Sequence, residues 1–323
     1  MCLGQIESTR EESKVHLQIG SPVRTVKYSL RGSPMPGPDL TAIGAAFGRA
    51  AHLLLDKRPF VFEDSLSIRL AEDEVLRAAN LLGPDGSLIV NADDHRVWWR
   101  SAFVARARVV EDSVMEHLEK GVCQYVILGA GLDTFAQRRP EVMPRLRLFE
   151  IDEPETQQWK QQRLRELALQ GAPNHRFVPV DFESGESWVA ALSKAGFNPG
   201  QPSVIASTGV AQYITVDAMT DTFRQAAGLA RGTVLISTFV PHADLIDPRE
   251  RHYRAQTEQG AASRGHPWIS FYTPKEFISI ASAAGFDSVH HIAADELNAR
   301  YFNNRADGLR AKSGENLIVA SKS

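Results

Sequence analysis

The spacing of hydrophobic residues divides the chain into two parts, with the change near residue 121. Before it, apolar residues recur at helical spacing in TAIGAAFGRAAHLLL, which begins at Thr41, and in VWWRSAFVARARVVEDSVMEHLEKG, which ends at Gly121. A glycine directly after such a segment is a typical helix C-cap. Residues 40–121 are therefore predicted to form a helical cover.

From residue 122 onward, short apolar runs alternate with helical segments. Segments such as PETQQWKQQRLRELALQG and TVDAMTDTFRQAAGLAR separate the runs. The runs have the length of buried strands and are QYVILG, RLRLFEID, HRFVPVD, SVIAST, GTVLISTF, FDSVHHIA and ENLIVAS. This alternation predicts an α/β fold in which helices cover both faces of a mostly parallel, doubly wound sheet, over residues 122–323.

The first 39 residues differ from the rest. They combine four prolines and several glycines with polar residues, a composition that buries little apolar surface. We predict an extended arm at 1–39, followed by a single domain at 40–323. The length of 323 residues is ample for the core of such a domain.

Charge and composition narrow the class of partner. Lys and Arg number 36 against 39 Asp and Glu, so the net charge of -3 shows no basic excess for a nucleic-acid backbone. No apolar run approaches the ~20 residues of a membrane span. Two cysteines, Cys2 and Cys123, are too few for a disulfide framework. These observations predict a cytoplasmic protein that binds a small molecule and neither nucleic acid nor membrane; an oligomer is compatible with them.

The clearest chemical signal is the turn after the first strand of the α/β part. QYVILGAGLDT leads from that strand into Gly129, Ala130 and Gly131. In a doubly wound sheet this turn approaches a bound nucleotide most closely, and glycines let the backbone come near the ligand. A dinucleotide fingerprint needs a further glycine where this chain has Thr134, which weakens an NAD interpretation.

Acidic residues end the next two strands. Asp152 follows Gly131 by 21 residues and stands where an acid can accept hydrogen bonds from ribose hydroxyls. It is equally well placed to cap the helix that begins at Pro154. Asp181 and Phe182 end the third strand, where they can contact the amine and the ring of an adenine, or simply begin a turn.

Taken together, these motifs resemble a known family. LGAGLDT, FEIDEPE, VDFE and AGFNPGQPSVIASTGVAQYIT are similar to the leucine carboxyl methyltransferase family of class I S-adenosylmethionine-dependent methyltransferases, in particular to its bacterial polyketide O-methyltransferase branch, which includes the tetracenomycin carboxyl-methylating enzyme. The resemblance extends over about residues 40–323. It implies a Rossmann-like sheet of seven strands in the order 3-2-1-4-5-7-6, with the seventh strand antiparallel.

The resemblance also implies a cofactor site for S-adenosylmethionine. Asp152 is implied at the ribose, and Arg106 at the methionine carboxylate, where a guanidinium can form two parallel hydrogen bonds. Arg49 is a second candidate for that carboxylate. Many family members have a glutamate where this chain has Thr208, which carries no charge for the cofactor's ammonium. The complete predicted set is Arg106, Gly129, Ala130, Gly131, Asp152, Asp181, Phe182 and Thr208, with no metal.

The implied reaction transfers a methyl group to an oxygen, most simply to a carboxylate of a small molecule or peptide. A carboxylate is ionised at neutral pH and needs no general base, so no catalytic residue is assigned. Tyr213, Trp99 and His266 are candidates for the acceptor site, although aromatic residues on helices usually belong to the core. His242 and His252 are further candidate bases. A hydroxyl or phenol acceptor, a non-enzymatic nucleotide-binding sensor or scaffold, and an NAD-dependent oxidoreductase are the alternatives.

Overall fold

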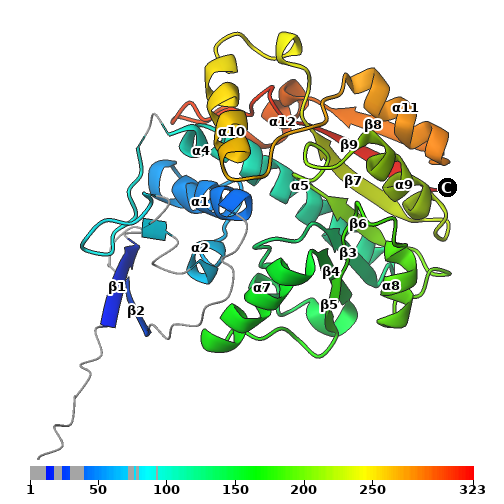
Figure 1. Cartoon of the computed structure of the whole chain (residues 1–323), viewed down its shortest axis with the longest axis horizontal. Helices are drawn as coiled ribbons and strands as arrows, with labels where there is room; N and C mark the ends of the chain where they lie inside the picture. The colour runs from blue at the N-terminus through cyan, green and yellow to red at the C-terminus, as the bar shows by residue number, and fades with distance from the viewer. Residues whose placement is uncertain (1–11, 18–23, 30–39, 72–75, 78–79, 92–93) are drawn as a thin grey trace, which may run out of the picture.

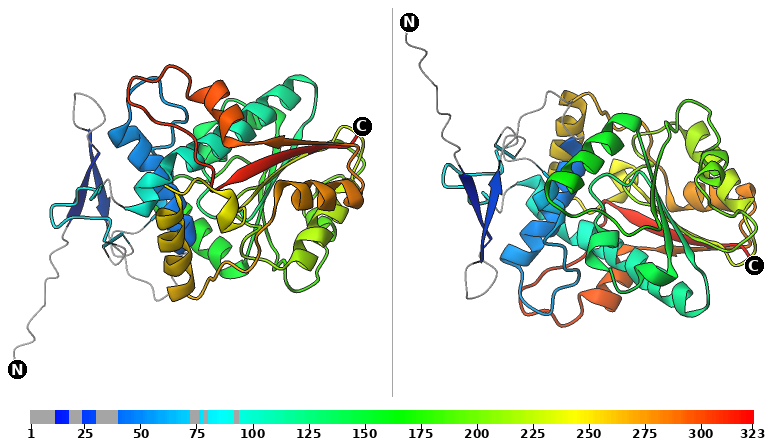
Figure 2. Two further views of the ribbon diagram at one scale, coloured as in Figure 1. Left: turned by 90° about the horizontal axis from the view of Figure 1, so that it is seen from above. Right: turned by 90° about the horizontal axis from the view of Figure 1, so that it is seen from below.

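The computed structural model describes residues 12–17, 24–29, 40–71, 76–77, 80–91 and 94–323. A seven-stranded sheet forms its centre, with helices on both faces (Figures 1 and 2). Its strands are β3 (Gln124–Leu128), β4 (Arg147–Asp152), β5 (His175–Pro179), β6 (Val204–Ser207), β7 (Val234–Phe239), β8 (Ser288–Ile292) and β9 (Asn316–Ser321). The strand order β5-β4-β3-β6-β7-β9-β8 is the predicted 3-2-1-4-5-7-6.

The direction of the strands brings several chain segments to one rim of the sheet. Strands β3 to β7 pair in parallel, so their carboxyl ends share that rim. Strand β9 runs antiparallel to β7, as predicted, with Asn316 opposite Phe239. The residues that precede β9 therefore lie at the same rim as the residues that follow β3, β4 and β6.

Alternating side chains of β3 fill two separate cores. Tyr125 and Ile127 pack on one face of the sheet with α5 (Arg100–Glu119), α6 (Phe135–Arg138) and α12 (Ala294–Tyr301). Val126 and Leu128 pack on the other with α8 (Trp188–Lys194), α9 (Val216–Ala227) and α11 (Pro274–Ala284). Every β3 residue is buried. This explains why the strand reads as a continuous apolar run instead of an alternating one.

The predicted helical cover forms a third core. Helix α1 (Leu40–Leu55) packs there with α2 (Ser67–Leu70), α4 (His95–Trp98) and α7 (Pro154–Glu166), as Figure 1 shows. The long segment expected to be one helix up to Gly121 is divided at Trp99 into α4 and α5. Gly121 has a φ of +88°, as expected of a glycine just past a helix end.

The remaining elements are short or lie at the edges. Within the predicted arm, β1 (Glu12–Leu17) and β2 (Arg24–Ser29) pair as an antiparallel hairpin, and the rest of the arm lies outside the described residues. Helix α10 (Arg251–Ser263) lies between β7 and α11 in the sequence and contacts α4. Two 3-10 turns complete the set, η1 (Met143–Arg145) and η2 (Ala243–Leu245).

A buried ionic cluster lies behind the second strand. Glu150 accepts from Lys160 Nζ at 2.5 Å and lies 3.0 Å from His175 Nε2, with all three side chains 1% exposed. Burial alone would raise the pKa of Glu150, but the two basic partners lower it below its usual value. The cluster ties β4, α7 and β5 together two residues before Asp152.

Candidate functional site

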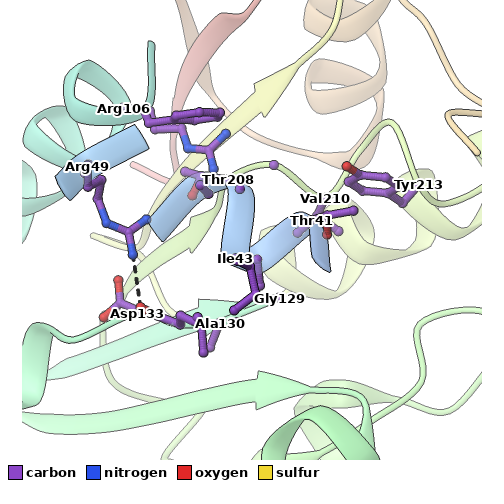
Figure 3. Close-up of a pocket in the computed structure, with 18 of the residues that line it drawn as sticks. Thr41, Ile43, Arg49, Arg106, Gly129, Ala130, Asp133, Thr208, Val210 and Tyr213 are labelled. Carbon is purple, nitrogen blue, oxygen red and sulfur yellow. Dashed lines mark hydrogen bonds between the residues drawn. The ribbon is translucent and has the colours of Figure 1, made fainter. Parts of the chain in front are cut away.

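A cavity of about 550 Å³ opens at the carboxyl ends of β3, β4 and β6. Helices α1, α4 and α5 and the carboxyl end of α10 contribute to its wall, so the helical cover closes the rim where the sequence predicts a ligand. Figure 3 shows residues of α1, of α5 and of the turns after β3 and β6 around it. Of the predicted site residues, Arg106, Gly129, Ala130, Gly131, Asp152, Phe182, Thr208, Tyr213, Trp99 and His266 line this cavity.

The glycine turn lies at the floor of the cavity and needs its glycines. Gly129 has a φ of +68°, and a Cβ there would lie 2.4 Å from Cγ2 of Val210. Gly131 has a φ of +47°, and its Cβ would lie 3.2 Å from that of Ala42. The amides of Gly129 and Ala130 both donate to the carbonyl of Ile151, at 2.9 and 3.0 Å. The turn is thereby held against the end of β4 with its backbone facing the cavity.

Asp152 meets the glycine turn from the neighbouring strand. Its Oδ2 accepts from the Gly131 amide at 2.5 Å and its Oδ1 from the Glu153 amide at 2.8 Å. Burial raises the pKa of Asp152 to about 6, despite these two hydrogen bonds. A carboxylate has about four acceptor positions, so two remain for a ligand. No side chain caps α7, whose N-cap is Glu153, so the capping interpretation is wrong. Asp152 lines the cavity, and its contact with a ribose stays a prediction.

The two residues proposed for adenine differ in position. Phe182 is half-buried and lines the cavity, as an apolar wall would. Asp181 is exposed and is not among the lining residues, and its Oδ1 accepts from the Glu183 amide at 2.8 Å. In this structure Asp181 thus shapes the turn after β5, and its contact with a ligand stays a prediction.

Arg106 projects from α5 into the cavity next to the loop that follows β6 (Figure 3). Its Nη1 donates to Glu315 Oε1 at 2.6 Å, and its guanidinium lies 5.1 Å from the centre of the Phe103 ring. A Cβ on Gly209 would lie 3.0 Å from Nη2 of Arg106. Thr208, directly before that glycine, lines the same part of the cavity.

Arg49 is positioned by fixed acceptors. Its Nε donates to Asp64 at 2.9 Å and its Nη2 to the Leu132 carbonyl at 3.0 Å. Burial alone would raise the pKa of Asp64, but Arg49 and Arg138 lower it below its usual value. Arg49 thus anchors α1 to the glycine turn, a role that the sequence does not indicate.

The carboxyl end of α10 and the loop after it form the wall that faces the helical cover. Trp99 Nε1 donates to Thr257 Oγ1 at 3.1 Å, and the Ile269 amide donates to the Gln212 carbonyl at 2.8 Å. The rings of Tyr213 and Trp268 meet edge to face, 6.5 Å apart. These contacts place three predicted acceptor residues, Trp99, Tyr213 and His266, in the same cavity as the glycine turn.

The histidines separate into two groups. His266 lines the cavity, whereas His242 and His252 are not among its lining residues; His242 lies 4.0 Å from Glu276. His95, which the sequence analysis does not single out, lines the cavity from the start of α4. Burial, with smaller contributions from nearby arginines, lowers the pKa of His95 despite the opposing effect of Asp94. Its imidazole is therefore neutral at neutral pH.

The lining residues that the sequence analysis does not single out include Asp133, Arg264, Glu315 and His95. Burial raises the pKa of Asp133, whose Oδ1 accepts from the Phe135 amide at 2.7 Å. Asp133 was visible in the quoted LGAGLDT motif, directly after the glycines. The other three lie in segments without a recognisable motif, and only the folding of α4, α10 and the β9 approach brings them to the rim.

The described part of the chain lacks two kinds of feature. No helix there is long and apolar enough to cross a membrane. Among the same residues, no three or more His, Cys, Asp and Glu side chains are grouped so that they could hold a metal ion.

Comparisons with known proteins agree with this architecture. The family model for leucine carboxyl methyltransferase matches residues 42–227, more than half of the chain. A relative in Bacillus subtilis (strain 168), named as a candidate S-adenosyl-L-methionine-dependent methyltransferase, YktD, is 27% identical over 299 residues, which cover 88% of this chain and 97% of that protein. One in Mycolicibacterium gilvum, also named as a candidate methyltransferase of this kind, is 31% identical over 55% of this chain and 65% of its own length.

A solved structure shares the fold. The crystal structure of a candidate methyltransferase from Thermobifida fusca YX superposes with a TM-score of 0.51 at 16% identity, covering 82% of this chain and 97% of the other. At this identity the likeness concerns the fold alone.

Proposed function

The chain belongs to the leucine carboxyl methyltransferase family and is an S-adenosylmethionine-dependent methyltransferase, and from this premise we propose that it forms methyl esters on carboxylates of small molecules or peptides. The family excludes the NAD-dependent and the purely scaffolding alternatives. The motifs similar to bacterial polyketide O-methyltransferases favour an acceptor of the natural-product type. We assign this function to residues 40–323 as one domain.

We propose that the cofactor lies along the floor of the cavity. The residues present fit it: the glycines at 129 and 131 leave no Cβ in the cradle, and Asp152 retains free acceptor positions for ribose hydroxyls. Phe182 supplies an apolar surface for the adenine ring, and Arg106 a guanidinium for the carboxylate. When bound, the cofactor supplies a methyl group activated by the positive charge on its sulfur.

The observation that carries the choice of a carboxylate acceptor concerns the arginines of the cavity. Arg49, Arg96, Arg106 and Arg138 line it and are each paired with a carboxylate. Arg264 also lines it and has no carboxylate partner among the described residues. A guanidinium at the rim, beside the proposed acceptor residues, is suited to hold an anionic acceptor.

The work of the protein in this reaction is alignment. Gly129, Gly131, Asp152 and Arg106 would hold the cofactor, which would supply an activated methyl group to an acceptor carboxylate oriented by Arg264. Because the acceptor is already ionised, no side chain has to remove a proton. Holding the two reactants in line contributes several kcal/mol, with effective molarities on the order of 10⁵ M or more.

A direct test uses salicylate, which offers a carboxylate and a phenol on one ring. With S-adenosylmethionine labelled in its methyl group, an ester product releases the label as methanol in alkali, whereas an aryl ether keeps it. We expect alkali-labile label. A second arm compares Arg264→Gln with Arg251→Gln, an exposed arginine of the same helix outside the cavity. Only Arg264→Gln should raise the KM for benzoate. In the salicylate arm, formation of the aryl ether by wild type and both variants would refute the proposal.

Hydroxyl methylation is the second candidate, favoured by the neutral imidazole of His95 in the cavity wall. A phenol has a pKa of about 10 and needs a base, so its single-turnover rate should rise with pH and lose that dependence in His95→Gln. A carboxylate acceptor should give a rate that is nearly flat between about pH 6 and 9. His252→Gln, at an exposed position outside the cavity, serves as the matched control.

A further inference from the structure

The cavity wall contains a buried ion pair in which only Arg106 has a role in the proposed function, and its partner Glu315 has none. Arg106 and Glu315 meet through Nη1 and Oε1 at 2.6 Å, and their side chains are only 12% and 10% exposed. A guanidinium has five N–H donors, and a carboxylate has about four acceptor positions. Among the described residues, the hydrogen bond between Arg106 and Glu315 is the only one that either side chain makes. Most of the hydrogen-bonding capacity of both groups is therefore left for a ligand.

This pairing is costly as a purely structural feature. Two charges removed from water are compensated only when good geometry and additional hydrogen bonds satisfy them. The nearby ion pair of Arg49 and Asp64 meets that condition, because Asp64 also accepts from the amides of Leu66 and Ser67. The pair of Arg106 and Glu315 does not meet it within the described residues.

We propose that Arg106 and Glu315 together bind the zwitterionic amino-acid end of the cofactor, with Glu315 accepting from its ammonium. An α-amino acid carries a carboxylate and an ammonium on one carbon. A guanidinium beside a carboxylate is complementary to this pair, because each group of the protein meets the group of opposite charge in the ligand. Arg106 takes the ligand's carboxylate and Glu315 its ammonium. The inference rests on the assignment of the cofactor to this cavity.

The position of Glu315 would compensate for the uncharged Thr208, which supplies no negative charge for the cofactor's ammonium. Thr208 and Gly209 follow β6, and a Cβ on Gly209 would lie 3.0 Å from Arg106 Nη2. Glu315 directly precedes β9, which is antiparallel and so begins at this rim. A carboxylate reaches the end of β6 from a different strand, and it supplies the negative charge that Thr208 lacks.

The loop before Glu315 is held firmly enough to position it. Glu250 Oε2 accepts from the Ser313 amide at 2.8 Å, from its hydroxyl at 2.7 Å and from the Gly314 amide at 3.2 Å. A Cβ on Gly314 would lie 2.1 Å from the Trp99 ring, so the backbone packs directly on that indole. These contacts fix the residue next to Glu315 on both sides of the loop.

The test separates the ammonium from the rest of the ligand. Calorimetry on the full chain would measure the affinities for three ligands. The first is S-adenosylhomocysteine, and the second is its deaminated analogue, which keeps the carboxylate but has hydrogen in place of the ammonium. The third is 5′-methylthioadenosine, which lacks the amino-acid end. Wild type should prefer S-adenosylhomocysteine to the deaminated analogue, and Glu315→Gln should lose about tenfold in affinity for the first alone, as expected for a charge-assisted hydrogen bond. Glu153→Gln, another lining acid, is the matched control.

Each outcome decides the question. If Glu315→Gln keeps the wild-type preference for the ammonium, or loses affinity equally for all three ligands, the proposal is overturned. If Glu315→Gln fails to fold, Glu315→Asp takes its place, together with the wild-type affinities for S-adenosylhomocysteine and its deaminated analogue. Equal wild-type affinities for these two ligands would overturn the proposal. Failure of the ester chemistry leaves these binding results untouched. A misplaced cofactor site would instead appear as 5′-methylthioadenosine binding that is insensitive to Asp152→Asn.

Discussion

The affinity for S-adenosylhomocysteine should depend on pH through Asp152. Its carboxyl is buried at the cavity floor, and burial raises its pKa to about 6. Ribose hydroxyls donate to the carboxylate and not to the acid, so ligand binding favours the ionised form. Binding therefore lowers the pKa of Asp152, and affinity increases as pH rises through about 6.

The size of the effect follows from this pKa. A carboxyl with a pKa of about 6 is about 97% ionised at pH 7.5 and about 9% ionised at pH 5. If only the carboxylate binds, the affinity falls about tenfold across this interval, or ~1.4 kcal/mol. At pH 7.5 we expect Asp152→Asn to bind more weakly than wild type by ~1–3 kcal/mol, the range for hydrogen bonds to charged groups.

Calorimetric titration of S-adenosylhomocysteine into both proteins between pH 5 and 7.5 provides the measurement. Any other group that titrates in this window is common to both proteins and cancels in the ratio of their affinities. The ratio of the wild-type affinity to that of Asp152→Asn should fall about tenfold between pH 7.5 and pH 5. A ratio that stays constant while both proteins remain folded would refute the assignment of Asp152 to the ribose.

Three further predictions concern the cavity and the sheet behind it. Arg106→Lys should weaken S-adenosylhomocysteine binding and leave adenosine binding level by calorimetry, because an ammonium cannot replace a forked donor; equal losses would indicate a structural arginine. Gly129→Ala should lower the Tm more than Gly185→Ala, because both have positive φ but only the first meets a side chain; equal shifts would contradict that packing argument. Lys160→Met should destabilise the fold by ~3–5 kcal/mol in urea unfolding, since Glu150 stays buried without its main partner, and a loss under ~1 kcal/mol would count against this account.

The sequence by itself indicated the strands and the floor of the site, while the order of the strands was what the family resemblance implied. Continuous apolar runs such as QYVIL indicated buried strands between two helical layers. The positions of Gly129, Gly131 and Asp152 follow from the same reasoning, because the turns after adjacent parallel strands meet at one rim. These residues are close to the strands that position them, so local pattern was sufficient.

Tertiary structure alone decided which distant residues complete that rim. Glu315 meets Arg106, 209 residues earlier in the chain, because β9 inserts antiparallel and begins where the other strands end. His95 and Arg264 reach the cavity through the packing of α4 against α10, and nothing in their own segments indicates it. Asp181 shows a second effect of the fold, since its Oδ1 accepts from the Glu183 amide of its own loop while its contact with a ligand stays a prediction. Side-chain direction at a loop depends on backbone hydrogen bonds that a one-dimensional pattern does not record.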